Sequence, residues 1–225
     1  TGNGKFAPNI TLRLASGGYI GGGLYHSQNI EGALTTLPGA RIVCPSFADD
    51  AAGLLRTSMR SKGFTLFLEP KALYNSVEAA AVVPEDFGVP FGKARIRREG
   101  TDLSIITYGN TTHFCLHVAE QLEKESGWKV EVIDIRSLIP LDKEAIFESV
   151  KKTSKALVVH EDKVFSGFGA ELAAMIGEEM FRYLDGPVQR VGSTFTPVGF
   201  NPILEKEILP DEAKIYEAAR KLLEY

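Results

Sequence analysis

The sequence predicts an α/β protein with a mostly parallel sheet. Two observations carry this prediction: short runs rich in β-branched residues recur along the chain, and amphipathic stretches of helical length separate them from position 102 onward. Strands that alternate with helices of about 10–15 residues form right-handed βαβ crossovers. With 225 residues, 44% of them hydrophobic, the chain is also long enough to bury a core.

Residues 92–225 are expected to form a complete α/β domain. Its predicted strands are 102–109, 129–135, 156–161 and 188–192, and its predicted helices are 111–125, 145–152, 170–183 and 211–224. Residues 110–112 can cap the first of these helices, and Asp142 can cap the second. A hairpin that turns at Gly100 is expected to add an antiparallel strand to the sheet.

Residues 1–75 form a thinner unit. The predicted strands are 9–16, 40–45 and 64–70, and the predicted helix is about 48–62. The segment 73–90 has the prolines of a surface connection, and we expect the linker at 76–91. Three strands and barely two helices provide little independent burial. We therefore expect that the chain begins inside a domain whose first half lies elsewhere.

The composition excludes several classes of partner. A formal net charge of −4 provides no basic field for nucleic acid or an anionic membrane. No apolar run approaches the roughly 20 residues of a membrane span, and the N-terminus lacks the pattern of a signal peptide. Cys44 and Cys115 lie in unrelated segments, which favours free, buried thiols in a reducing compartment.

A glycine run over residues 17–23 precedes the strongest candidate residue, His26. The run follows a predicted strand, as a phosphate loop would, but no Lys-Ser/Thr pair follows at the Walker spacing. His26 also stands where a dinucleotide fingerprint needs a third glycine. A loop that lets the backbone approach another group closely is the simpler interpretation. Tyr25, Ser27 and Gln28 flank His26, whose imidazole can donate or accept a proton near neutral pH.

The other histidines carry weaker signals. His113 and His117 have i, i+4 spacing without a third ligand nearby, which favours a packed or solvated pair over a metal site. His160 ends a predicted central strand, where α/β sheets place their sites, so a role at the edge of the site and a structural hydrogen bond both stay open. Gly167 and Gly169 fit either a nucleotide loop or close packing of a strand against a helix.

Several motifs occur together in the order of one known family. They are GGGLYHSQNIEG (21–32), LPGARIVCPSFADDAAGLLRTSMR (37–60), FLEPKALY (67–74), VIDIRSLIPLD (132–142) and VVHEDKVFSGFGAE (158–171). In these motifs the chain closely resembles the β subunit of a 2-oxo acid dehydrogenase E1 component over essentially its whole length. FLEPKALY and TFTPVGFNPILE (194–205) are most similar to the branched-chain (2-oxoisovalerate) enzymes, with pyruvate and acetoin relatives close behind.

The resemblance implies a thiamine-diphosphate enzyme made of α and β chains. It assigns 1–75 to the latter part of the pyrimidine-binding domain and 92–225 to a transketolase C-terminal-like domain. The cofactor, with Mg²⁺, is then shared with the α subunit or an α domain and with the missing first half of the domain. That half is expected to carry the glutamate that activates the cofactor, so the isolated chain is expected to be inactive.

The resemblance also implies partners and a compartment. The expected partners are the α subunit, a second β chain, the lipoyl and subunit-binding domains of the E2 acyltransferase, and a 2-oxo acid substrate. The compartment is the cytoplasm in a bacterium or the mitochondrial matrix in a eukaryote.

His26 matches the active-site histidine of the family. There it supplies a proton as the acyl group passes from thiamine to the lipoyl sulfur. Tyr25 and Gln28 are expected to orient its ring. The other residues expected to line the site are Ser27, Gly22 and Gly23. The family also holds a K⁺ ion with backbone carbonyls, at the positions that Ser58, Ser61 and Gly63 occupy here.

Two alternatives stay open. The chain could be the C-terminal half of a transketolase or a deoxyxylulose-phosphate synthase, although YHSQ and FLEPKALY argue against this interpretation. It could also act as a non-catalytic assembly module that joins subunits and receives the E2 core.

Overall fold

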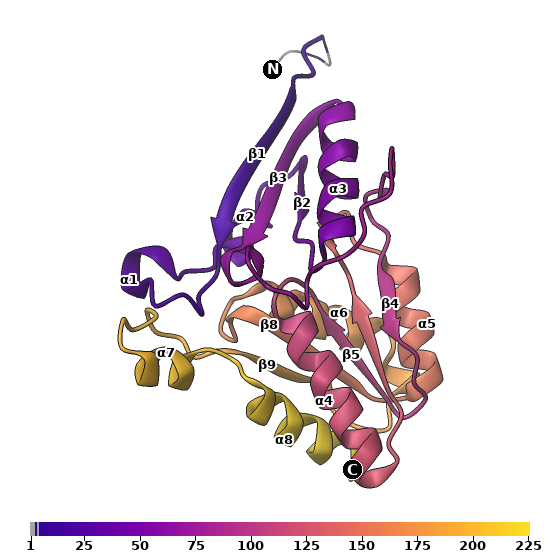
Figure 1. The fold of residues 1–225 in the computed structure, drawn as a ribbon. Coiled ribbons are helices and arrows are strands. Elements are labelled where there is room, and N and C mark those ends of the chain that lie inside the picture. Colours follow the sequence, from indigo (N-terminus) through magenta and orange to yellow (C-terminus); the bar gives the residue numbers. More distant parts are fainter. Residues whose placement is uncertain (1–2, 4) are drawn as a thin grey trace.

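The strands of the chain form two sheets, with helices packed around them (Figure 1). The computed structural model describes residues 3 and 5–225. None of the helices in that part of the chain combines the length and the apolar character needed to cross a bilayer. Cys44 and Cys115 are buried and free, as predicted.

The first sheet has the strand order β1-β3-β2-β7. It consists of β1 (Asn9–Ser16), β2 (Ala40–Val43), β3 (Gly63–Pro70) and β7 (Ser137–Ile139). Its other elements are α1 (Gly23–His26), α2 (Glu31–Leu34), α3 (Ala48–Arg60) and the short 3₁₀-helix η1 (Lys71–Leu73). The three parallel strands and the long helix were predicted. The antiparallel strand β7 was not, and it comes from the second unit of the sequence.

The second sheet has the strand order β4-β6-β5-β8-β9. Its strands are β4 (Arg95–Arg98), β5 (Leu103–Thr107), β6 (Val130–Asp134), β8 (Ala156–Lys163) and β9 (Gln189–Ser193). The helices are α4 (Thr111–Ser126), α5 (Lys143–Thr153), α6 (Phe168–Glu179), η2 (Phe181–Tyr183), α7 (Pro202–Ile208) and α8 (Glu212–Leu223). The four predicted parallel strands are therefore confirmed, with boundaries shifted by a few residues.

The predicted hairpin at Gly100 is wrong. β4 is antiparallel, as expected, but it pairs with β6 and not with β5. Both edges of β5 are occupied by the parallel strands β6 and β8, so no edge is free for β4. The chain instead crosses the start of β6, where Thr101 and Asp102 both donate their N–H groups to the Lys129 carbonyl at 2.9 Å.

The helix caps differ in part from the prediction. Asp142 caps α5 by accepting a hydrogen bond from the Ala145 N–H at 3.4 Å, as predicted. Asn110 stands at the cap of α4 but makes no side-chain capping bond, and the Thr111 hydroxyl bonds the Tyr108 carbonyl instead. Helix α7 was not predicted, although the Asn201 side chain caps it.

One hydrophobic core joins the two sheets. Ile42 and Leu68 from the first sheet pack in the same cluster as Ile106 and Val158 from the second. The linker adds to the burial, because Val89 packs beside α3 in a cluster with Leu54. The thin first unit therefore buries its strands against the second unit. The domain boundaries given above stay a prediction.

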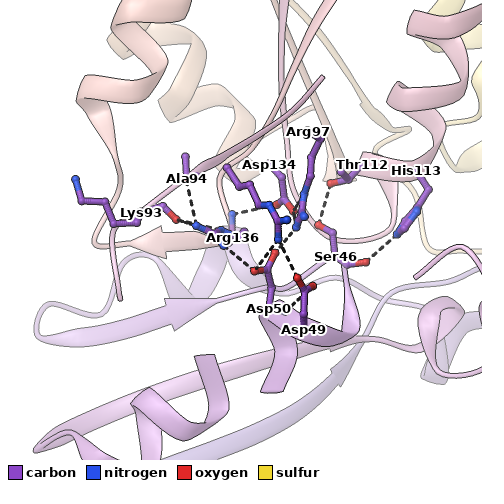
Figure 2. Close-up of polar contacts among 11 residues, drawn as sticks. Ser46, Asp49, Asp50, Lys93, Ala94, Arg97, Thr112, His113, Asp134 and Arg136 are labelled. Atoms are coloured by element: carbon purple, nitrogen blue, oxygen red, sulfur yellow. Dashed lines mark hydrogen bonds and ion pairs between the residues drawn. The ribbon is translucent and has the colours of Figure 1, made fainter. Parts of the chain in front are cut away.

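A cluster of four buried charges lies between the two units (Figure 2). Asp50 of α3 accepts hydrogen bonds from the guanidinium groups of Arg97 and Arg136, the latter at 2.7 Å. Arg97 also donates to Asp134 at 2.7 Å. The aspartate side chains are fully buried, and the arginine side chains are 7% and 8% exposed. Two positive and two negative groups thus balance each other away from water.

The same cluster holds the start of the second unit. Arg136 donates to the backbone carbonyls of Lys93 and Ala94 at 2.8 and 3.1 Å. Burial raises the pKa of Asp134, and the guanidinium of Arg97 opposes that rise. A buried charge without its partner is strongly unfavourable, so this cluster stabilises only the arrangement in which all four groups meet.

Replacing Asp50 with Ala is expected to lower the free energy of unfolding by about 3–5 kcal/mol, because it leaves guanidinium charge buried without a partner. Urea unfolding followed by circular dichroism measures this loss. Glu120→Ala is the control, since the ion pair of Glu120 with Lys124 is exposed on both sides and such pairs contribute about 1 kcal/mol or less. Equal losses in the two variants would contradict the role of the buried cluster.

Candidate functional site

His26 lies at the end of α1, on the loop that follows β1. The residue is exposed, and no hydrogen bond of its side chain is found within the described part of the chain. Its surroundings are set by residues 17–28, which leave the carboxyl end of β1. Parallel sheets place their sites at this end.

The glycine run has an unusual backbone conformation. The φ angle is positive at every second residue: 86° at Gly17, 61° at Tyr19, 62° at Gly21 and 60° at Gly23. Left-handed residues placed between residues of other conformations can turn successive N–H groups toward the same side, as in anion-binding nests. Three of the four positions are glycine, the residue that adopts positive φ readily.

Two carboxylates of the chain itself bind N–H groups of this run. Glu161 accepts a hydrogen bond from the Gly18 N–H at 2.6 Å. Glu205 accepts from the N–H groups of Ile20 and Gly21, each at 3.3 Å. The run therefore binds internal anions with the N–H groups that a phosphate loop would offer. This supports the interpretation of the run as a loop of close backbone approach.

The end of β8 contacts the loop of His26 and the helix α2 that follows it, at three consecutive positions. Besides the contact of Glu161, the Asp162 carboxylate accepts a hydrogen bond from the Gly32 N–H at 3.1 Å. Lys163 donates to the side-chain oxygen of Gln28 at 2.8 Å. The residues after His160 are therefore structural hydrogen-bonding partners that support the loop of His26 from the second unit.

His160 itself is wholly buried under glycines. A Cβ atom on Gly169 would lie 2.2 Å from its ring, and one on Gly167 would lie 2.9 Å away. The two glycines thus permit close packing of β8 against α6, the structural alternative considered for them. Burial lowers the pKa of His160 to about 4, so its ring is neutral at physiological pH.

The predicted neighbours of His26 make no hydrogen bond to its side chain within the described residues. Tyr25 is 87% exposed, and the Gln28 amide donates to the Leu24 carbonyl at 3.1 Å. Ser27 is buried, and its hydroxyl has no hydrogen-bond partner among the described residues. Gly22 lies directly against His26, because a Cβ atom there would be 2.9 Å from that of the histidine. The orienting role predicted for Tyr25 and Gln28 stays a prediction.

Buried carboxyl groups gather beneath the loop. Burial raises the pKa of Glu31 to about 8, and the charge of Asp162 contributes to the rise. Burial also raises the pKa of Glu161 to about 7, against the hydrogen bond from Gly18. Glu31 and Glu161 line a small cavity of about 10 Å³ together with Ser16, which is room for about one water molecule.

The predicted cation site lies at the turn between α3 and β3. The Ser61 N–H donates to the Ser58 carbonyl at 3.3 Å, and Gly63 has a φ of 103°. The guanidinium of Arg41 lies beside Gly63. Its positive charge disfavours a second cation at this turn. A potassium ion held by these carbonyls stays a prediction.

His113 and His117 have separate structural partners. The ring of His113 donates to the Ser46 carbonyl at 2.8 Å, and burial lowers its pKa. His117 is exposed and lies 2.6 Å from a carboxylate oxygen of Glu212, at the start of α8. Within residues 3 and 5–225, no group of three or more His, Cys, Asp or Glu side chains could hold a metal ion.

A larger cavity, of about 470 Å³, lies between α3, β3 and the linker. Its wall is mostly apolar and includes Leu55 and Phe67, with Glu69 and Tyr74 on its polar side. The Tyr74 hydroxyl donates to Glu69 at 2.9 Å. His26 is not among the lining residues, so this cavity and the loop of His26 are separate features.

Two family models match the chain. The transketolase pyrimidine-binding domain matches residues 3–77, and the transketolase C-terminal domain matches residues 92–215. A solved structure of a split-gene transketolase, an inactive β4 tetramer, superposes with a TM-score of 0.77 over 96% of this chain and 67% of its own. At 22% identity this likeness shows the fold alone. The predicted fold class is confirmed.

Enzyme subunits from two bacteria are similar in sequence to nearly the whole chain. The 2-oxoisovalerate dehydrogenase subunit β of Bacillus subtilis is 39% identical over 99% of this chain and 68% of its own length. The pyruvate dehydrogenase E1 component subunit β of Staphylococcus aureus is 39% identical over 100% of this chain and 68% of its own length. Equal identity to both means that these values do not separate the two substrates.

Glu31→Gln is expected to stabilise the chain at pH 8–9 and to change its stability little near pH 5. The folded-state pKa of Glu31, about 8, lies above its ordinary value of 4.5. The native chain therefore loses stability as the pH rises between these values, because the unfolded state releases the proton first. Glutamine removes this loss. Melting temperatures measured across pH 5–9 provide the test, and parallel curves for the two proteins would contradict it.

Proposed function

Because the chain belongs to the family of thiamine-diphosphate-dependent E1 β subunits of 2-oxo acid dehydrogenases, we propose that it takes part in oxidative decarboxylation and acyl transfer to the E2 lipoyl group. The observation that carries the proposal is an exposed imidazole on a loop held from two sides. The loop of His26 is held by hydrogen bonds to Glu161 and Glu205, and the His26 side chain is exposed, so that another molecule can reach it.

The proposed substrate is a branched-chain 2-oxo acid, 2-oxoisovalerate. The segments FLEPKALY (67–74) and TFTPVGFNPILE (194–205) support it by their resemblance to the branched-chain enzymes. Pyruvate is the alternative, because the pyruvate relative is equally identical. The split-gene transketolase shares the fold at 22% identity and does not favour a transketolase reaction.

Thiamine diphosphate, when bound, supplies the carbon nucleophile and the electron sink for decarboxylation. We propose that this chain contributes part of the pyrimidine side of the site, while an α subunit or α domain holds the diphosphate and Mg²⁺. The inactivity of the isolated chain and the K⁺ ion stay predictions.

The proposed role of His26 is that of a general acid. A thiolate that leaves the lipoyl dithiolane needs a proton donor effective near neutral pH, and imidazole is such a group. The exposure of His26 allows a lipoyl group to approach. The contacts of Gly18, Ile20 and Gly21 with the two glutamates limit the movement of its loop.

We propose that an E1 α subunit covers the aromatic patch beside His26. The patch consists of side chains that are 50–87% exposed: Leu24, Tyr25, Phe165, Phe195, Phe200 and Ile203. Phe200 lies against Gly23 of the His26 loop, and the rings of Phe165 and Phe195 are 4.7 Å apart. The exposed area, on the order of 1,000 Å², matches one side of a stable interface.

E2 is proposed to dock near the C-terminus. The final helix, α8, buries Leu222 and Leu223 in the core of the second sheet. Truncating this end would therefore disturb the fold. The exposed residues there that a partner could contact are Arg220, Lys221, Glu224 and Tyr225. A second β chain is the remaining proposed partner.

This chain, joined to the expected first half of its pyrimidine-binding domain, is co-expressed with an E1 α subunit. The complex is expected to have a higher kcat/KM for 2-oxoisovalerate than for pyruvate. Phe200→Glu is expected to prevent assembly, because it puts a charge in the aromatic patch, beside the loop of His26. Affinity purification and a decarboxylation assay measure the two properties.

Val82→Glu is the matched control, because Val82 is 90% exposed, against 77% for Phe200, but lies on the linker and is not part of the patch. Assembly of the Phe200→Glu variant would refute the proposed α surface. A higher kcat/KM for pyruvate would refute the substrate.

In that complex, His26→Ala is expected to slow acylation of a lipoyl domain by roughly 10²–10⁴-fold, the contribution of a positioned acid. Decarboxylation with an artificial electron acceptor is expected to change little, since that step does not need the proton of His26. Both assays are run on the same preparation.

His117→Ala, which removes another exposed histidine, provides the control for nonspecific effects. Equal losses of the two activities in His26→Ala would leave His26 without the role of an acid.

A further inference from the structure

The loop that carries His26 bonds to two carboxylates that come from distant parts of the chain. Glu161 lies in β8, and Glu205 lies in α7. We propose that Glu161 and Glu205 are positioning residues, a carboxylate clamp that fixes the glycine loop and thereby the place of His26. The inference rests on the proposed function only for the role of His26. The clamp itself is tested by a measurement that does not depend on enzymatic activity.

Glu205 holds the middle of the loop. Its carboxylate accepts from two neighbouring N–H groups, those of Ile20 and Gly21, at 3.3 Å. Glu205 is buried, in contrast to Glu207 on the same short helix, which is exposed. Hydrogen bonds to an ionised acceptor are stronger than those to a neutral one. A buried glutamate at this position thus has a specific partner in the loop.

Glu161 holds the start of the loop. It accepts from the Gly18 N–H at 2.6 Å, and a Cβ atom on Gly17 would lie only 2.6 Å from its carboxylate oxygen. Gly17 also has a φ of 86°, a conformation that other residues adopt at a cost. The backbone at Gly17 is therefore shaped to admit this carboxylate.

The loop needs such a restraint because its conformation is strained. Tyr19 is not a glycine and yet has a φ of 61°. Its hydroxyl donates to the Pro210 carbonyl at 2.6 Å, which anchors the side chain beyond the end of α7. Residues in sparsely populated conformations persist only where surrounding contacts hold them, and they gather at functional sites.

The clamp also includes a buried carboxylate, Glu161, whose ionisation lowers the stability of the fold. Burial raises the pKa of Glu161 to about 7, so the fold loses free energy to keep this carboxylate ionised at neutral pH. Perturbed carboxyl groups of this kind are typical of functional sites. An apolar residue would pack there without that cost but could not accept the Gly18 hydrogen bond.

Amide hydrogen exchange of the 225-residue chain, followed by NMR, tests the clamp. Glu205→Met keeps the side-chain volume and removes the acceptor. The exchange of the Ile20 and Gly21 amides is then expected to accelerate about 10- to 100-fold. Glu205→Gln keeps one neutral acceptor oxygen and is expected to have an intermediate effect. If Glu205→Met does not fold, the Gln variant carries the test.

Glu207→Met is the matched control, because it makes the same substitution on the exposed side of the same helix. Unchanged exchange of core amides such as Ile105 and Val158 verifies the fold. Unchanged exchange of Ile20 and Gly21 in the folded Glu205 variants would overturn the clamp.

Activity assays of the complete E1 distinguish the effect of the clamp on the loop from its effect on the role of His26. Glu205→Gln is expected to lower kcat for acylation of a lipoyl domain while kcat for decarboxylation is retained, and Glu207→Gln is expected to change neither. Faster amide exchange with unchanged acylation would refute the positioning of His26 by the clamp, whereas the acid role of His26 is tested separately by His26→Ala. The clamp as a restraint on the loop would still be established by the exchange data.

Discussion

The buried charge cluster of Asp50, Asp134, Arg97 and Arg136 sets the relation between the two halves of this chain. Both carboxylates are removed from water. Asp134 pairs with Arg97 inside the second unit, but Asp50 of α3 finds a guanidinium only when the first unit meets Arg97 and Arg136 of the second. Hydrophobic contacts alone would tolerate sliding, since they are not directional. Four buried charges that must be paired do not tolerate sliding. They accompany a hydrophobic core that both sheets share.

This fixed arrangement allows one unit to hold the site of the other. The loop of His26 belongs to the first unit, but its N–H groups bond to Glu161 and Glu205 of the second. The carboxyl end of β8 adds Asp162 and Lys163 to the same support. The strained backbone of the glycine run persists because these contacts restrain it, and the buried carboxyl groups beneath it are an energetic cost of that support.

The predictions from sequence failed where a residue had more than one partner to choose from. Strand β4 reads like the first half of a hairpin with β5, but β5 already has two parallel neighbours, so β4 pairs with β6. Asn110 has the residue type of a helix cap, yet the Thr111 hydroxyl turns to the Tyr108 carbonyl. Asn201 and Pro202 are a capping residue and a first-turn proline, which together indicate the start of helix α7. The helix has only seven residues, too few to show a helical periodicity in the sequence.

The sequence by itself determined the fold class, the parallel strands, the longer helices and the family, because these depend on residue periodicity and on short contiguous motifs. It also singled out His26, which stands in such a motif. Only the tertiary structure decided what the glycine loop binds, since Gly18 and Glu161 are 143 positions apart. It likewise decided that Glu205 is buried against the loop while Glu207 is exposed. The physical reason is that hydrogen bonds between distant segments depend on how the two units pack, and no local pattern records that packing.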